Sequence, residues 1–108
     1  MPQLELVNDF GVLIYGLPHF EDDQQVVLQD GHQDQGPLAI LGAGTGLGMA
    51  RGVQTSSGLM ALSSEGGHRE FAPRSDEEWQ LACWLKEDLG VDRLSIERVV
   101  SGTGLGHI

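Results

Sequence analysis

The chain opens with an apolar segment, a polar pair and a second apolar segment. Residues 4–7 carry apolar side chains at three of four positions and predict a strand. Asn8 and Asp9 then precede the apolar residues 10–17, and Pro18 ends this stretch. Because Asn and Asp are favoured N-cap residues, the pattern predicts a short helix with Asn8 or Asp9 at its start.

The middle of the chain predicts a glycine-rich β-hairpin. An apolar run at residues 38–41 leads into glycines on alternate positions, Gly42, Gly44, Gly46 and Gly48. The partial alternation of residues 47–53 is typical of a second strand. Residues 54–58 then predict a hairpin tip before a short strand at residues 59–62.

A polar stretch lies between these two regions. Residues 21–36 are rich in acidic residues and glutamine around the apolar triplet Val26, Val27 and Leu28. They predict a surface excursion that contains one short strand. We interpret the acidic side chains as a solvated face rather than a metal site.

The second half of the chain contains the clearest helix. Ser75 is a natural N-cap, Glu78 completes a capping box, and Gly90 ends the segment. Helical spacing of Leu81, Trp84, Leu85 and Leu89 predicts a core face. Cys83 is expected to be a small core residue.

The elements that follow this helix are predicted less clearly, and the fold class is left between two possibilities. Residues 94–100 fit either a strand or a short helix, and residues 101–105 predict a second glycine-rich bend. Strands grouped before a long helix favour an α/β or α+β domain with an incomplete first sheet. Both ends of the chain are expected to be cut, and unpaired strand edges predict self-association into a homo-oligomer.

Composition narrows the classes of partner. The 108 residues suffice for one small domain. The formal charge is −10, and all seven charged residues before Arg51 are acidic, so nucleic acid and membrane surfaces are not expected as partners. The sequence shows one cysteine, no C-x-x-C pair, no signal peptide and no long apolar run, which predicts a soluble cytoplasmic protein.

The glycine-rich hairpin is a candidate phosphate site. Gly44 and Gly46 let backbone N–H groups converge on an anion, and Thr45 adds a hydroxyl between them. The sequence matches neither the P-loop, which needs Lys and Ser/Thr after its last glycine, nor the dinucleotide fingerprint. A turn that binds nothing is the open alternative.

A second candidate site is the sequence Glu65-Gly66-Gly67-His68. A helical Glu-x-x-His motif would suggest a metal site, but adjacent glycines argue against a helix and favour a loop. Glu65 and His68 then supply a hydrogen-bond acceptor and a donor/acceptor. A surface turn with no function is the alternative here.

Read together, four motifs in order resemble the bacterial glucokinase family of ATP-dependent hexose kinases. They are Val7-Asn8-Asp9-Phe10, Gly42-Ala43-Gly44-Thr45-Gly46-Leu47-Gly48, Ser64-Glu65-Gly66-Gly67-His68 with Phe71-Ala72-Pro73, and Glu97-Arg98-Val99-Val100-Ser101-Gly102. The resemblance implies an α/β actin-like, ribonuclease-H-like ATPase fold, present here in part as one incomplete domain. Residues 1–18 would be the end of the small domain and the hinge, and residues 19–108 part of the large domain.

The resemblance also implies roles for individual residues. In the complete protein, the γ-phosphoryl group of ATP-Mg²⁺ would pass to the 6-hydroxyl of glucose or another hexose, with Asp9 as the base. Carried over motif by motif, the sugar ligands are Asn8, Asp9, Glu65, His68 and Glu97. The phosphate side is Gly44, Thr45 and Gly46, and no side chain is assigned to a metal.

The sequence also departs from the family pattern. The N-terminal Asp-x-Gly-Gly-Thr loop and the C-terminal glycine-rich region for ATP are not in this chain, and Gly102-Thr103-Gly104 stands where Gly-Pro-Gly is usual. The segment alone is therefore expected to be inactive. The alternatives are a non-catalytic hexose-binding or regulatory relative without the nucleotide half, and an acidic structural module.

Overall fold

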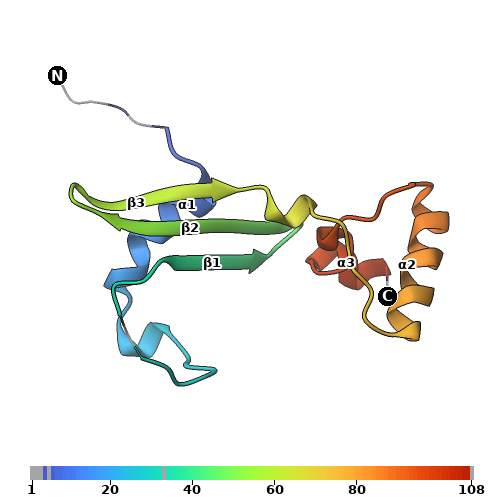
Figure 1. Ribbon diagram of the computed structural model, residues 1–108, viewed down its shortest axis with the longest axis horizontal. Helices are drawn as coiled ribbons and strands as arrows, with labels where there is room; N and C mark the ends of the chain where they lie inside the picture. The colour runs from blue at the N-terminus through green and yellow to red at the C-terminus, as the bar shows by residue number, and fades with distance from the viewer. Residues whose placement is uncertain (1–3, 5, 33, 108) are drawn as a thin grey trace. The chain divides into compact units, whose positions relative to one another are not determined.

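The computed structural model describes residue 4, residues 6–32 and residues 34–107, and contains helices and one three-stranded antiparallel sheet (Figure 1). The strands are β1 (Leu38–Ala43), β2 (Leu47–Thr55) and β3 (Gly58–Ser64), and they lie in the order β1-β2-β3. This confirms the predicted α/β class, the glycine-rich hairpin and the strand at residues 59–62. The chain divides into two compact units.

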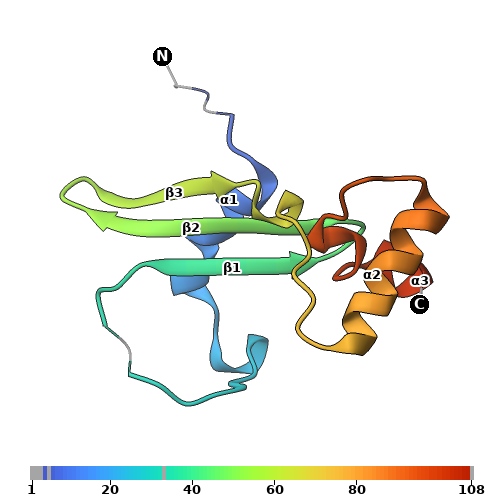
Figure 2. The same ribbon diagram turned by 45° about the vertical axis from the view of Figure 1, so that its right-hand side comes forward.

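In the first unit, residues up to 40 and 50–64, helix α1 (Asp9–Gly16) packs on β3 (Figures 1 and 2). Ile14 is fully buried, and Gly52 on β2 leaves the room that it fills, since a Cβ there would lie 2.6 Å from Ile14 Cγ2. The Tyr15 hydroxyl accepts the Ala61 N–H at 3.1 Å. A fully buried side chain and one cross-element hydrogen bond thus hold the helix to the sheet.

The predicted N-cap is confirmed, whereas two predicted strands are wrong. The Asn8 side chain caps α1. Leu4 and Leu6 are more than nine-tenths exposed and form no strand, and the prediction at Glu5 lies outside the described residues. Residues 26–28 are also exposed and follow a 3₁₀ helix, η2 (Asp22–Gln24). The side chains of Leu4, Leu6 and residues 26–28 are mostly exposed, so burial does not hold these segments in a sheet.

The second unit, residues 41–49 and 65 onward, is built around helix α2 (Asp76–Leu89). Ser75 Oγ accepts the Glu78 N–H at 3.2 Å, and Gly90 ends the helix with φ 63°. The other half of the predicted capping box shifts by one residue, because Glu78 accepts from the Arg74 N–H at 2.6 Å. In Figure 2 the chain leaves β3, passes a short turn and enters α2.

One stripe of α2 forms the core of this unit, and the aromatic side chains lie outside it. Ala82 and Leu85 are buried with Leu94, and Phe71, Leu81, Leu89 and Val99 pack around them. The predicted burial of Cys83 and Trp84 is wrong. Cys83 is exposed, Trp84 is 49% exposed and Trp79 is 61% exposed. Ala82 and the leucines of α2 make its contacts with the core, so the remaining side chains of the helix lie toward solvent.

The C-terminal part differs from the predicted bend. Residues 94–100 contain the short 3₁₀ helix η4 (Ile96–Arg98), and the predicted bend at residues 101–105 is replaced by helix α3 (Gly102–His107). Buried Ser101 accepts the Gly104 N–H at 2.9 Å through its Oγ and the Leu105 N–H at 3.0 Å through its carbonyl. This cap starts a helix despite the low helix propensity of three glycines.

Candidate functional site

The Glu-Gly-Gly-His sequence forms a tight turn rather than the predicted loop. Its residues form the 3₁₀ helix η3 (Gly66–His68), in which the His68 N–H donates to the Glu65 carbonyl at 3.0 Å. A single 3₁₀ turn fixes few residues, so two glycines are tolerated. Arg93 donates to the His68 carbonyl through its guanidinium, which ties the end of the turn to the segment that precedes η4 in the same unit.

A short antiparallel pairing brings the turn close to Glu97. The Phe71 N–H donates to the Leu94 carbonyl at 2.8 Å, and the Ile96 N–H donates to the Arg69 carbonyl at 2.7 Å. These two bonds flank the bridge between Glu70 and Ser95. Since Glu97 follows immediately, its side chain reaches His68.

Glu65, His68 and Glu97 form what we call the carboxylate–histidine cluster. His68 Nε2 lies 3.3 Å from Glu65 Oε2, and His68 Nδ1 lies 3.1 Å from Glu97 Oε1. The Glu97 side chain is 24% exposed, whereas that of Glu65 is 86% exposed. Ionised carboxylates only accept hydrogen bonds, while imidazole contributes donors. The cluster therefore offers both partners that a ligand with several hydroxyl groups needs.

Glu97 also contacts the turn between β1 and β2, which we call the glycine turn (residues 44–47). Glu97 Oε2 accepts the Leu47 N–H at 3.3 Å. Glycine at two positions makes this approach possible. A Cβ at Gly46 would lie 2.7 Å from Glu97 Oε2, and a Cβ at Gly67 would lie 2.2 Å from the Leu47 carbonyl oxygen. One carboxylate thus joins the cluster to the glycine turn.

The carbonyl groups of residues 44–46 in the glycine turn are engaged inside the protein. Gly44 O accepts from the Gly102 N–H at 2.7 Å, Thr45 O from the Thr103 hydroxyl at 2.8 Å, and Gly46 O from the Gly44 N–H at 3.0 Å. Within residues 34–107, no acceptor is bonded to the N–H of Thr45 or Gly46. A turn with its carbonyls tied and two N–H groups open is suited to an anion.

Asn8 and Asp9 lie in the first unit, at the start of α1. Asn8 Oδ1 accepts the Phe10 and Gly11 N–H groups at 3.0 and 3.4 Å, and Asp9 Oδ1 accepts the Phe10 N–H at 2.8 Å. Each exposed side chain therefore uses one oxygen to hold the helix start. The Nδ2 group of Asn8 and the second carboxylate oxygen of Asp9 are not part of the cap.

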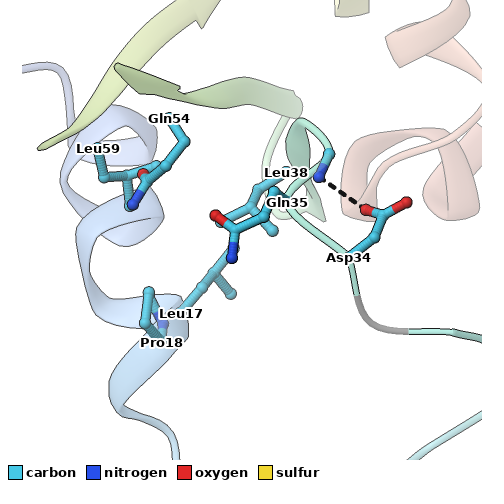
Figure 3. Close-up of a pocket in the computed structure, with 8 residues that line it drawn as sticks. Leu17, Pro18, Asp34, Gln35, Leu38, Gln54 and Leu59 are labelled. Atoms are coloured by element: carbon cyan, nitrogen blue, oxygen red, sulfur yellow. Dashed lines mark hydrogen bonds between the residues drawn. The ribbon is translucent and has the colours of Figure 1, made fainter. Parts of the chain in front are cut away.

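The first unit also contains an open pocket of about 340 Å³ (Figure 3). Its lining is apolar and amide in character, and its one carboxylate, Asp34, accepts the Gly36 N–H at 2.7 Å. The lining residues are Leu17, Pro18, Asp34, Gln35, Gly36, Leu38, Gln54 and Leu59. None of the sugar or phosphate ligands predicted from the sequence lines this pocket.

In the described parts of the chain, no three His, Cys, Asp or Glu side chains are grouped so that they could hold a metal ion. The helices there are also too short or too polar to cross a membrane.

Three contacts of the site carry no signal in sequence spacing. The Leu47–Glu97 and Thr45–Thr103 bonds join residues 50 and 58 positions apart, and the Arg93–His68 bond spans 25. Ser101, by contrast, does carry a local signal, because a serine at a helix start is a recognisable N-cap. It would have indicated α3 and so placed Thr103 on a fixed element.

Comparison with known proteins shows consistent similarity. The family model described as Glucokinase matches residues 1–108. Curated relatives named glucokinase include those of Synechocystis sp., 45% identical over 98% of this chain, and Nostoc sp., 42% identical over 97%. The chain spans only about a third of their length, 30% and 31% respectively.

Solved structures give the same result. A glucokinase from an Antarctic psychrotroph matches 94% of this chain and 31% of its own chain, with a TM-score of 0.81 and 36% identity. The glucokinase of Balamuthia mandrillaris in complex with glucose matches 69% of this chain and 22% of its own, with a TM-score of 0.62 and 28% identity.

Proposed function

Because this chain belongs to the glucokinase family, we propose that it supplies most of the hexose ligands and part of the phosphate site of an ATP-dependent hexose kinase. The complete protein would have the actin-like ATPase fold, with residues 1–18 at the end of its small domain and hinge and residues 19–108 in its large domain. A cytoplasmic location is part of the same proposal.

The observation that supports this proposal best is the double contact of Glu97. One carboxylate oxygen lies 3.1 Å from His68 and the other 3.3 Å from the Leu47 nitrogen. The groups suited to a sugar are therefore adjacent to the turn suited to a phosphate. Phosphoryl transfer requires this adjacency, because the attacking hydroxyl must lie in line with the γ-phosphoryl group.

On the sugar side, Glu65, His68 and Glu97 would bind hydroxyl groups, with the carboxylates accepting. Asn8 would donate through Nδ2, since its Oδ1 caps α1. Asp9 would accept the proton of the 6-hydroxyl through the oxygen that its helix contact leaves over. As that proton leaves, the hydroxyl oxygen bonds to the γ-phosphorus and the bond to the ADP oxygen breaks.

On the phosphate side, the open N–H groups of Thr45 and Gly46 fit an anionic oxygen. Gly44 would contribute as a turn residue, because its own N–H is bonded to the Gly46 carbonyl. ATP with Mg²⁺ supplies the transferable phosphoryl group with part of its charge neutralised. We assign no residue of this chain to the ion.

A hexose-binding or regulatory relative without catalysis is the competing function. It would use the same cluster for sugar, but it would need no nucleotide at the glycine turn. ATP binding at Thr45 and Gly46 therefore separates the two functions.

The test is a glucose titration of the 108-residue chain followed by NMR, with galactose as the comparison sugar. We expect glucose to shift the resonances of His68 and the Leu47 amide, and Glu97→Gln to weaken binding about 10-fold or more through loss of a charged acceptor. Glu70→Gln is the matched control, since Glu70 is a carboxylate of the same unit whose ion-pair partner is Lys86.

Equal glucose affinity of Glu97→Gln and the unsubstituted chain would contradict the sugar site. In the complete protein, Asp9→Asn should abolish phosphorylation while glucose binding weakens only modestly. Undiminished turnover by that variant would remove Asp9 from the role of base.

A further inference from the structure

The glycine turn presents three consecutive peptide units, and each has its carbonyl oxygen held by a different donor. The donors are the Gly102 N–H for Gly44, the Thr103 hydroxyl for Thr45, and the Gly44 N–H for Gly46. In a trans peptide unit the C=O and the following N–H point in opposite directions. Holding a carbonyl therefore also sets the direction of the next N–H.

The N–H groups that follow these three carbonyls belong to Thr45, Gly46 and Leu47, and the same rule relates their directions to the bonds of the carbonyls. The third, on Leu47, donates to Glu97. The first two, on Thr45 and Gly46, are the open donors of the turn within residues 34–107. Their direction depends on what holds the Gly44 and Thr45 carbonyls.

Of the two donors from α3, only that of Thr103 depends on the side chain. A backbone N–H is available at position 102 for any residue except proline, whereas the Thr45 carbonyl needs a hydroxyl at position 103. The close approach of Gly102, where a Cβ would lie 3.0 Å from Gly44 O, brings position 103 within reach. Because the Ser101 cap fixes the start of α3, the hydroxyl donates from an anchored element.

We propose that Thr103 is a positioning residue that locks the peptide unit between Thr45 and Gly46 so that the Gly46 N–H faces an anionic ligand. The ligand part of this inference rests on the proposed function, whereas the lock itself does not.

The hydrogen bond from Thr103 to the Thr45 carbonyl is needed because this peptide unit can reverse its direction easily. Flipping it requires changes in ψ of Thr45 and φ of Gly46, and glycine accepts the positive φ that results. After such a flip, the Thr45 carbonyl oxygen would take the place of the Gly46 N–H and repel an anion. The Thr103 hydroxyl bond opposes the flip, and a β-branched residue holds its hydroxyl in few rotamers.

The first measurement needs no ligand. Thr103→Val removes the hydroxyl and keeps the shape, whereas Thr103→Ser keeps the hydroxyl. We expect Thr103→Val to move the Gly46 amide and Thr45 carbonyl NMR resonances and to add exchange broadening there, while Thr103→Ser restores them. The resonances of α2 serve as the check that both variants are folded. Unchanged resonances of Thr45 and Gly46 in Thr103→Val would overturn the lock.

The second measurement is a titration of the same three chains with ATP and, separately, with glucose. We expect Thr103→Val to weaken ATP binding about 3- to 10-fold, the effect of one hydrogen bond, and to leave glucose affinity unchanged. A purely structural role would weaken both ligands together, which contradicts the proposal. If the unsubstituted chain binds no ATP, the hydrogen bond from Thr103 is decided by the ligand-free resonances alone, and ATP binding by the complete protein decides the phosphate side of the proposed function.

Discussion

Gly67→Ala tests whether the cluster and the glycine turn depend on backbone contact. An added Cβ would lie 2.2 Å from the Leu47 carbonyl oxygen, and real Cβ contacts essentially never fall below 3.0 Å. The neighbouring atom is backbone, so no side-chain rotation relieves the clash. Leu47 must therefore move away from Gly67.

The expected loss of stability has two causes, overpacking and a broken hydrogen bond. Overpacking typically costs about 1–3 kcal/mol. The bond from the Leu47 N–H to Glu97 is 3.3 Å long, already beyond the usual range of about 2.7–3.2 Å, so displacement breaks it. A hydrogen bond to a charged group contributes about 1.5–3 kcal/mol. We expect a total loss of about 2–4 kcal/mol in the free energy of unfolding, because the two terms overlap.

Urea unfolding followed by circular dichroism measures this loss, and the Leu47 amide resonance reports the broken bond. Gly44→Ala is the matched control, since it lies in the same turn with no atom within 4 Å of an added Cβ; it should change stability by less than about 1 kcal/mol. A Gly67→Ala chain that is as stable as the unsubstituted one, with an unmoved Leu47 amide, would refute the reasoning.

Three other predictions concern the packing of α1 and the start of α2. Gly52→Ala should destabilise the first unit by about 1–3 kcal/mol in thermal unfolding, because the added Cβ would lie 2.6 Å from the buried Ile14; Gly16→Ala, with open space around it, should not, and equal losses would contradict this. Ser75→Ala should cost about 1 kcal/mol, which Ser75→Asp recovers. Backbone hydrogen bonding and the Ser75 hydroxyl lower the pKa of Glu77, so its stabilising contribution is present above the ordinary value of 4.5 and is lost as pH falls below it. An NMR titration of the Glu77 carboxyl should show a midpoint below 4.5 that rises in Ser75→Ala; an unmoved midpoint would exclude the serine as a cause.

Local chemistry explains which elements could be predicted from the sequence. The hairpin, α1 and α2 have their signals within a few residues, in alternating apolar positions, glycines and the caps Asn8 and Ser75. For α3, the local sequence argues against the element and distant contacts support it. Its glycines argue locally against a helix, while the bonds to the glycine turn come from residues almost sixty positions away.

The candidate site divides in the same way. Resemblance to a family identified Glu65, His68 and Glu97 as a set, and the structure places them in one cluster. The contact of Glu97 with Leu47 depends on the pairing of residues 69–71 with residues 94–96, which no local pattern contains. The assignment of Asp9 as base and of the turn as phosphate ligand stays a prediction.

The placement of the aromatic residues gives each unit its own spectroscopic probe. Both tryptophans of the chain, Trp79 and Trp84, lie on α2 outside its buried stripe, and the one tyrosine, Tyr15, lies on α1. Fluorescence excited at the red edge, where only indole absorbs, therefore follows the melting of the second unit, whereas the NMR resonances of the Tyr15 ring follow the first. Coincident curves would mean that the two units unfold as one cooperative body, and separated curves that each has a transition of its own.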